Sequence, residues 1–435
     1  MGKAHLVRRF GHFAGALLAA APAVAGTFVV DDSGGADFTD VPPAIAAAAP
    51  GDLILVRDGL YSSFFLEKGL AIVADGGAEP QWDQGFAWVR NVPAGQTATL
   101  AGLNLQTLRI QACDGTVLID DCTLEPGSYP LNPPVVTALS VVNCDLVVLS
   151  RSHFAGASGS DQAAAVPQFG PVPGADLHTS KVIASQCSFD GGGGSTLYKS
   201  HGLTGQPAIQ AQSTLLVLQG SSAHGGRGGH GWNFPIGELL LNDGGDGAPA
   251  LELDACTLQL FGAATDVIEG GQGGEPSDFL AFPGDSAPAL SSTSSDTSWS
   301  GVSLQTFDGV PIFDLAGGSL VAVLPAVPTL VATGSGLLGD ALSLQLAGPA
   351  NAAYLLWVSP FSTHLPLGAK PMPLLLGAPL IELGLGALDP AGAGSLPLVV
   401  PALPVLQGVA ANFQAFVKPA AGPSGLSTST SLILR

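Results

Sequence analysis

The chain has 435 residues and carries 34 acidic residues against 14 lysines and arginines, a net charge of −20. This balance argues against nucleic acid and anionic membranes as partners, because both bind proteins through basic surfaces. With 59 glycines, 34 prolines and only 11% charged residues, the sequence predicts few helices, and its length allows two domains.

The first 25 residues are typical of a secretory signal peptide. Lys3, Arg8 and Arg9 precede an apolar segment, residues 13–25, that ends in an Ala-Val-Ala cleavage signal. The segment is short and rich in glycine, alanine and proline, which disfavours the alternative of a retained membrane anchor. We expect cleavage after residue 25, no membrane span in the mature chain, and a secreted or cell-surface location.

The stretch 37–76 predicts one short helix followed by two short strands. Phe38, Val41 and Ile45 form an apolar stripe at helical spacing, and the Pro-Gly pair at 50–51 ends the helix. Apolar runs at 53–56 and 70–73 then alternate with Asp-Gly turns. A small helix ahead of stacked short strands is typical of the cap that covers the first coil of a solenoid.

The segment 35–61, GADFTDVPPAIAAAAPGDLILVRDGLY, resembles the opening of secreted bacterial pectin-lyase-like β-helix proteins. In those proteins a Phe-x-x-hydrophobic helix leads through Pro-Gly-Asp into V-x-x-G-x-Y, and pectin methylesterases begin similarly. The resemblance covers about forty residues and implies an all-β fold, a right-handed parallel β-helix with an N-terminal capping helix. It carries none of the family's catalytic residues.

Internal repeats support stacked strands. A polar–small–polar–apolar tetrad recurs with its second residue 30, 35, 34 and 35 residues apart, at positions 122, 152, 187, 221 and 256. A Pro-Ala-apolar triplet recurs at 207–209, 249–251 and 288–290. The two elements have similar periods, which predicts coils of one solenoid.

The five cysteines follow these repeats. Cys122, Cys187 and Cys256 share the tetrad position, and Cys113 and Cys144 form a second column. An odd number of cysteines without metal-site spacing favours small buried side chains stacked between coils over a disulfide framework.

Glycine-rich inserts are the predicted functional surface. They span residues 156–178, 191–206, 224–248 and 262–287, and the shared return triplet predicts that they emerge side by side from one edge. They collect polar groups that are scarce elsewhere. The candidate catalytic residues are Lys199, His201, Arg227 and His230, and the candidate binding residues are Trp232, Asp266 and Glu269. The alternative is that the inserts are solvated and have no function.

Two short segments of the sequence carry chemical signals, one for calcium binding and one for sugar hydrolysis. Asn242, Asp243 and Asp246 offer oxygen ligands suited to Ca²⁺, although Asp-Gly is also ordinary turn chemistry. Gly229-His230-Gly231 and Asp120-Asp121-Cys122 resemble fragments of polygalacturonase-type β-helix hydrolases, but the other signature elements of those enzymes are missing. Consecutive aspartates on a strand also point to opposite faces, which does not suit a pair of catalytic carboxylates.

A domain boundary is predicted near 325, where the repeats stop. The remaining residues, 326–435, predict short strands separated by Pro/Gly turns, as in a small β-sandwich domain. This domain could contact carbohydrate or shield the last coil of the solenoid. The domain plan is therefore a signal peptide at 1–25, a β-helix at 26–325 and a β-sandwich at 326–435.

Two function classes remain open on the sequence. The first is a non-catalytic, secreted β-helix scaffold that contacts carbohydrate, with extracellular polysaccharide as a possible partner and Ca²⁺ as a possible ligand. The alternative is a polysaccharide lyase or glycoside hydrolase with an unrecognised active site, which would need a base and a carboxylate facing one groove.

Overall fold

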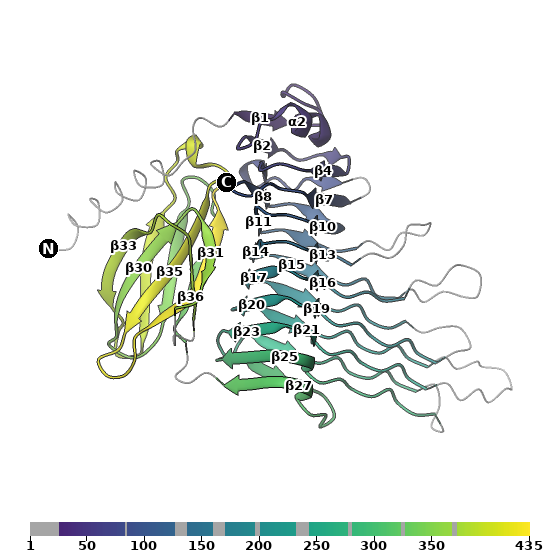
Figure 1. Cartoon of the computed structure of the whole chain (residues 1–435). Helices are drawn as coiled ribbons and strands as arrows, with labels where there is room; N and C mark the ends of the chain where they lie inside the picture. The colour runs from purple at the N-terminus through teal and green to yellow at the C-terminus, as the bar shows by residue number, and fades with distance from the viewer. Residues whose placement is uncertain are drawn as a thin grey trace.

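The computed structural model describes residues 26–82, 85–126, 137–159, 170–195, 201–231, 243–276, 281–322, 327–367 and 372–435. It is nearly all β, and its strands from residue 27 to residue 322 pair in parallel, coil upon coil, as a parallel β-helix (Figure 1). The fold class predicted from the sequence is confirmed. The predicted signal peptide lies outside the described residues, and no described helix is long and apolar enough to cross a membrane.

Each full coil of the β-helix contributes one strand to each of three sheets. Sheet 1 contains β4 (Phe64–Leu66), β7 (Phe86–Arg90), β10 (Thr107–Gln111), β13 (Leu139–Val142), β16 (Ala175–His178), β19 (Ile209–Gln212) and β22 (Leu251–Asp254). Sheet 2 contains β1 (Thr27–Val30), β2 (Leu53–Val56), β5 (Ala71–Ala74), β8 (Thr97–Ala101), β11 (Thr116–Asp120), β14 (Leu146–Ser150), β17 (Lys181–Ser185), β20 (Leu215–Gln219) and β23 (Thr257–Phe261). The long strands β25 (Leu290–Ser300) and β27 (Phe313–Ala322) continue through both sheets.

Sheet 3 is narrower and precedes the inserts. It contains β9 (Asn104–Leu105), β12 (Thr123–Leu124), β15 (His153–Ala155), β18 (Ser188–Asp190), β21 (Ser222–His224), β24 (Val267–Glu269) and β26 (Ser303–Gln305). Near the N-terminal end, β3 (Leu60–Tyr61) pairs with β6 (Gln81–Trp82), and a short 3-10 turn spans Asp75–Gly77.

The helix predicted at the N-terminal end is present as α2 (Val41–Ala47). Asp40 caps it by accepting a hydrogen bond from the Val41 amide, and Pro42 and Pro43 lie in its first turn. Its apolar side, Val41, Ala44 and Ile45, is buried at the end of the solenoid (Figure 1). The first coil begins earlier than the sequence predicted, because β1 pairs with β2 ahead of the predicted strands.

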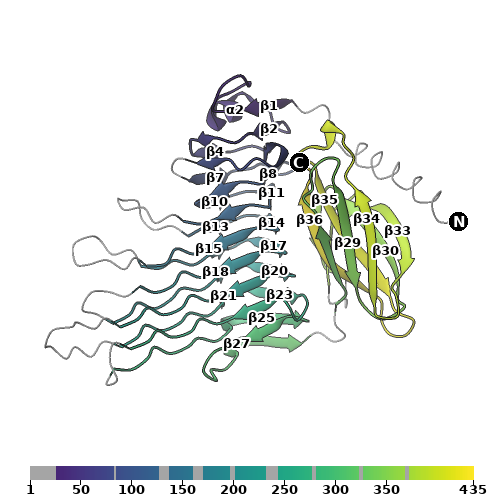
Figure 2. The same cartoon turned by 180° about the vertical axis from the view of Figure 1, so that it is seen from behind.

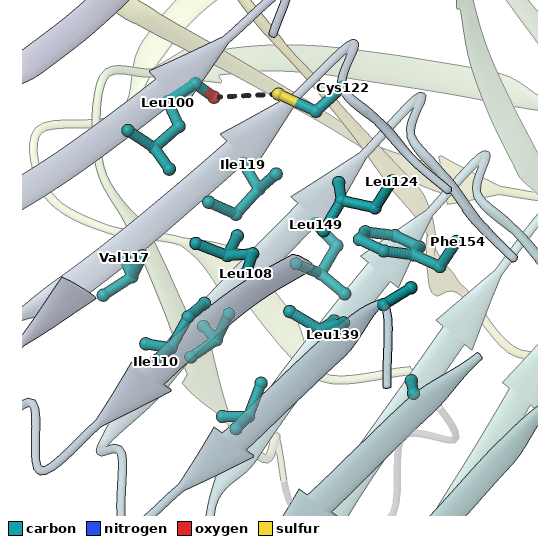
Figure 3. Packing of buried hydrophobic residues seen from close by; sticks show 14 of the residues in the cluster. Leu100, Leu108, Ile110, Val117, Ile119, Cys122, Leu124, Leu139, Leu149 and Phe154 are labelled. Atoms are coloured by element: carbon teal, nitrogen blue, oxygen red, sulfur yellow. Dashed lines mark hydrogen bonds between the residues drawn. The ribbon is translucent and has the colours of Figure 1, made fainter. Parts of the chain in front are cut away.

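The core consists of aliphatic side chains stacked in register between coils. Leu100, Ile119 and Leu149 occupy one column across three coils, as Figure 3 shows. Columns of this kind run along the whole solenoid and leave the core residues essentially unexposed. The burial of apolar surface is therefore spread evenly over the coils, as expected for a solenoid.

The cysteines lie at the corners of the coils, and all five are free and buried, as predicted. One part of the alignment is wrong. Cys122 and Cys187 follow strands of sheet 2, whereas Cys256 follows β22 of sheet 1 and belongs with Cys113 and Cys144. Both corners have a left-handed residue followed by a small buried one, so they look alike in sequence.

The C-terminal strands pair antiparallel in separate sheets. One contains β28 (Thr329–Thr333), β29 (Ala341–Ala347) and β34 (Ala393–Val399); another contains β30 (Ala353–Ser359), β33 (Ile381–Ala387), β35 (Ala410–Lys418) and β36 (Gly425–Ile433). The strands β31 (Ser362–Leu365) and β32 (Leu374–Leu376) pair beside them, and a 3-10 turn spans Pro404–Leu406. The two larger sheets bury a common apolar core. We call residues 327–435 the C-terminal region.

The C-terminal region lies along sheet 2, and the suggestion that it shields the last coil is wrong (Figures 1 and 2). Outward-facing apolar residues of sheet 2, such as Leu118 and Val148, share a buried cluster with Leu426 and Ile433. Leu315 and Val321, in β27 at the end of the solenoid, remain exposed. Sheet 2 is therefore the covered side of the β-helix.

Candidate functional site

The four glycine-rich inserts project from one edge of the solenoid, between sheet 3 and sheet 1, as predicted (Figure 1). Their return triplets enter β19, β22 and β25 in register, with Ile209, Leu251 and Leu290 aligned. Three predicted boundaries are wrong. The first insert ends before β16, the third starts after β21 at residue 225, and the fourth starts at residue 270, because residues 267–269 form β24.

Each insert runs out along one chain and returns along another, which produces a two-layer array. The outgoing chains are 156–159, 191–195, 225–231 and 270–276, and the returning chains are 170–174, 201–208, 243–250 and 281–289. Within a layer, Gly228 donates its amide to the Gln272 carbonyl of the next coil at 2.9 Å. Between layers, Gly229 donates to the Leu203 carbonyl at 2.8 Å.

The array has a three-residue period, as polyproline II chains do. In the third outgoing chain Gly226, Gly228 and Gly229 are buried, whereas Arg227 and His230 are exposed. Two residues of every triplet thus face neighbouring chains, and the third faces solvent.

Glycine is required at the buried positions because the neighbouring backbones approach too closely for a side chain. A Cβ atom on Gly228 would lie 1.8 Å from the Gly245 carbonyl oxygen, and one on Gly229 would lie 2.2 Å from the Ser195 carbonyl oxygen. The glycines that look like low-complexity sequence are therefore packing residues.

The array separates the described candidate residues onto two faces. Arg227 and His230 take third positions of an outgoing chain, whereas His201, Asp243 and Asp246 take third positions of returning chains. The two layers hydrogen-bond to each other through their buried positions, so their exposed positions lie on opposite faces. The structure therefore does not bring these residues together around one groove.

Several third-position side chains have a local structural partner. Several third-position amides of the array have no backbone acceptor, and a side chain of the preceding coil accepts from them. Asp243 Oδ1 accepts from the Phe282 amide at 2.7 Å, Asp246 Oδ1 from the Asp285 amide at 2.8 Å, and His201 Nδ1 from the Asp243 amide at 2.9 Å. These bonds tie neighbouring coils together at the surface of the array.

The other candidates lie elsewhere. Lys199, Trp232 and Asn242 fall outside the described residues. Asp266 caps the corner before β24 by accepting from the Ala263 amide, and Glu269, in β24, lies 3.5 Å from His224. Within the described ranges, no group of three histidine, cysteine or acidic side chains is arranged to hold a metal ion. Calcium binding at 242–246 and the catalytic and binding roles stay predictions.

The outer face of sheet 1 is a polar surface that the sequence analysis did not single out. The C-terminal region lies on the other side of the solenoid, beside sheet 2, so it leaves this face uncovered (Figures 1 and 2). We call it the open face. One in-register column along it consists of Phe65, Trp88, Arg109, Ser140, Asp176, Gln210, Glu252 and Ser291.

Polar contacts hold several side chains of the open face in place. In β16, Asp176 Oδ1 lies 2.8 Å from His178 Nε2, and Gln212 donates to Asp254 of the next coil at 3.0 Å. The outcome is a ladder of polar side chains, some of them held by neighbouring side chains, with one rung about 4.8 Å from the next.

An aromatic and cationic cluster occupies the N-terminal end of the open face. Phe65 lies with its ring centroid 5.6 Å from that of Trp88 and 5.8 Å from that of Phe86. The Arg90 guanidinium stacks over Phe65 and Trp88 at 5.2 and 5.0 Å and is fixed by Glu67 at 2.7 Å. Phe65 remains 46% exposed, so an apolar ring is presented to solvent beside hydrogen-bonding groups.

The signal for the open face was present in the sequence. Segments such as IQAQ at 209–212 and LELD at 251–254 alternate apolar and polar residues, as expected for strands with one side buried. The strands of sheet 2 lack this alternation, because the C-terminal region covers them.

A cleft of about 450 Å³ lies between the solenoid and the C-terminal region. His153 and Asp266 line it from the solenoid side, and Thr329 and Thr428 line it from the other side. Its lining combines hydroxyl and amide side chains with the Arg151 guanidinium and with an apolar share at least as large as the polar one. A cleft of this volume suits a small molecule, whereas the open face extends over many coils.

No protein-family model and no curated protein sequence matches the chain. Among solved structures, the full-length tailspike protein 2 of Escherichia coli O157:H7 bacteriophage CAB120 is similar at 10% identity and a TM-score of 0.28, with 94% of this chain and 64% of that chain covered. The chain thus spans less than two thirds of that protein.

Two further tailspike structures are also similar. The enzymatically active domain of bacteriophage CBA120 tailspike protein 2 matches at 10% identity and a TM-score of 0.28, covering 94% of this chain and 71% of that domain. The Dettilon tailspike protein matches at 8% identity and a TM-score of 0.24, covering 86% and 89%. The assignment as a parallel β-helix protein rests on the strand pairing itself.

Proposed function

We propose that this chain is a non-catalytic scaffold, secreted or at the cell surface, whose open face contacts polysaccharide. We also propose that the chain divides into a β-helix domain at residues 26–325 and a β-sandwich domain at residues 326–435. The observation that carries the proposed function is the in-register ladder on sheet 1, which begins at an exposed aromatic ring. A sugar ring offers an apolar side to an aromatic ring and hydroxyl groups to fixed donors and acceptors, and the open face supplies both.

The ladder suits an extended polymer better than a small molecule. Carboxylates, amides and hydroxyls recur at every coil of sheet 1, from Ser140 through Asp176 and Gln210 to Glu252. Such a surface spreads weak contacts over many repeats of a chain. Affinity then comes from their number, with no single deep pocket required.

A pair of phenylalanines allows a matched test. Phe65 on the open face and Phe361 in the C-terminal region are each 46% exposed. Binding of the full chain to neutral and acidic polysaccharides is measured with and without Ca²⁺. We expect Phe65→Ala to weaken binding by about two- to tenfold, as expected for an aromatic contact, and Phe361→Ala to leave it unchanged.

Two results would count against this function. Equal effects of the two substitutions, or no binding to any polysaccharide, would remove the open face as the binding surface. Release of new reducing ends or of unsaturated uronides would replace the scaffold by a polysaccharide hydrolase or lyase.

A further inference from the structure

The hydrogen bonds within each layer of the glycine array all run in one direction along the solenoid. Within each layer, the amides of one coil donate to the carbonyls of the next coil. Gly231 donates to the Glu275 carbonyl and Gly244 to the Phe282 carbonyl, both at 2.9 Å. The last coil therefore has an edge that would present unpaired N–H groups, and such an edge is a template for adding a further chain.

The last coil of the array has no fifth insert below it. The next connection, between β26 and β27, is the short segment 306–312. Close to the solenoid the edge is covered by the end of β26 and by this connection: Gly270 donates to the carbonyl of Gln305, the last residue of β26, at 3.1 Å. Gly273 donates to Ser286 Oγ, which in turn donates to Asp308.

Farther out, proline occupies the donor positions. In the outgoing layer, Gly228 aligns with Gly273 of the last coil, so Gly231 aligns with Pro276. In the returning layer, Gly247 aligns with Ser286 of the last coil, so Gly244 aligns with Pro283. Proline has no amide hydrogen, so neither position presents a donor at the open edge.

We infer that Pro276 and Pro283 terminate the glycine array and prevent the inserts of a second copy of this chain from adding to it. The two prolines thereby exclude another glycine-rich chain that has free carbonyls at three-residue spacing. The matching acceptor position in the first coil of the array is that of Ser158, to whose carbonyl no described amide donates. A donor edge on one copy and an acceptor edge on another make a heterologous contact that does not close, which leads to open-ended assembly.

The placement of the other prolines supports this inference. Pro207, Pro249 and Pro288 take third positions of the triplets, where the amide does not point at the next coil. Pro171 takes a donor position in the first coil, so the array tolerates the loss of one internal hydrogen bond. Beyond the part covered by segment 306–312, both described donor positions of the last coil are prolines.

The test restores the two amides without changing the local side-chain volume greatly. The double variant Pro276→Ala/Pro283→Ala keeps a Cβ atom at each position and adds an N–H group. Pro288→Ala, in the same returning chain but at a third position, is the matched control. Sedimentation velocity of the full chain over a range of concentrations measures self-association.

We expect the sedimenting mass of the double variant to rise with concentration to at least double that of the wild-type protein, while Pro288→Ala behaves like wild type. Circular dichroism and hydrogen exchange confirm that the variants are folded, and the amides of residues 276 and 283 should gain protection on association. An unchanged mass in the folded double variant, or equal association of the control, would overturn the inference.

Discussion

Replacing Asp120 with alanine should loosen the C-terminal region from sheet 2. The Asp120 carboxylate is 1% exposed and joins three elements. It accepts from Ser150 Oγ at 2.9 Å, from Arg151 Nε and Nη2 at 3.0 and 2.5 Å, and from the Ile433 amide at 2.6 Å. Removing it leaves the Arg151 guanidinium, whose side chain is 13% exposed, without its carboxylate, and leaves the Ile433 amide without an acceptor.

The expected loss of free energy follows from the burial of the ion pair between Asp120 and Arg151. Breaking a buried ion pair by removing one partner costs about 3–5 kcal/mol. The matched control is Asp145→Ala: Asp145 pairs with Lys181 at 2.8 Å, but the two side chains are 65% and 50% exposed. An exposed pair of this kind contributes about 0–1 kcal/mol.

Hydrogen exchange is the most direct assay, because the two parts of the chain can open separately. In Asp120→Ala the amides of Ser429 and Ile433, which donate to Gln219 and Asp120 of the solenoid, should lose protection by up to the factor that corresponds to the lost free energy, while core amides of β14 keep theirs. Urea unfolding gives the accompanying free energy. If Asp120→Ala costs no more than Asp145→Ala, the carboxylate does not hold the interface together.

Two further predictions concern the glycine array and the corners of the coils. Gly228→Ala places a Cβ against the Gly245 carbonyl and should lower the free energy of unfolding in urea by about 1–3 kcal/mol. Arg227→Ala should change that free energy by less than about 0.5 kcal/mol, and equal effects of the two substitutions would refute the packing role of Gly228. Burial raises the pKa of Cys122 and of Cys187 to about 12, so both thiols should resist a thiol reagent at pH 8 in the native protein and react on unfolding. Site-resolved mass spectrometry checks this, and rapid native labelling of either thiol would contradict it.

Individual elements were predicted well where the signal is local. The helix at Val41–Ala47 follows from an apolar stripe that ends at a Pro-Gly pair, and the strands Leu53–Val56 and Ala71–Ala74 follow from apolar runs between turn residues. The misalignment of Cys256 has a local cause as well. Both corners of a coil need a left-handed residue followed by a small buried one, so one-dimensional spacing does not distinguish them.

The candidate site was predicted less well. The sequence indicated which segments leave the solenoid and that they leave from one edge, since the return triplets are explicit. It did not reveal that Arg227 and His201 lie on opposite faces, because the three-residue period within the glycine-rich inserts becomes apparent only when the chains pack against one another. The open face was missed although its alternation is visible, because alternation alone does not say whether another layer covers the polar side.

The sequence by itself determined the solenoid: repeated short apolar runs, small corner residues and a capping helix specify parallel coils through contacts between adjacent repeats. Only the tertiary structure decided which surfaces are available. The C-terminal region joins sheet 2 through contacts such as that between Asp120 and the Ile433 amide, 313 residues apart. Packing at that separation depends on the shape and chemistry of two completed surfaces, which no local pattern records. By covering sheet 2, this packing leaves sheet 1 as the open face.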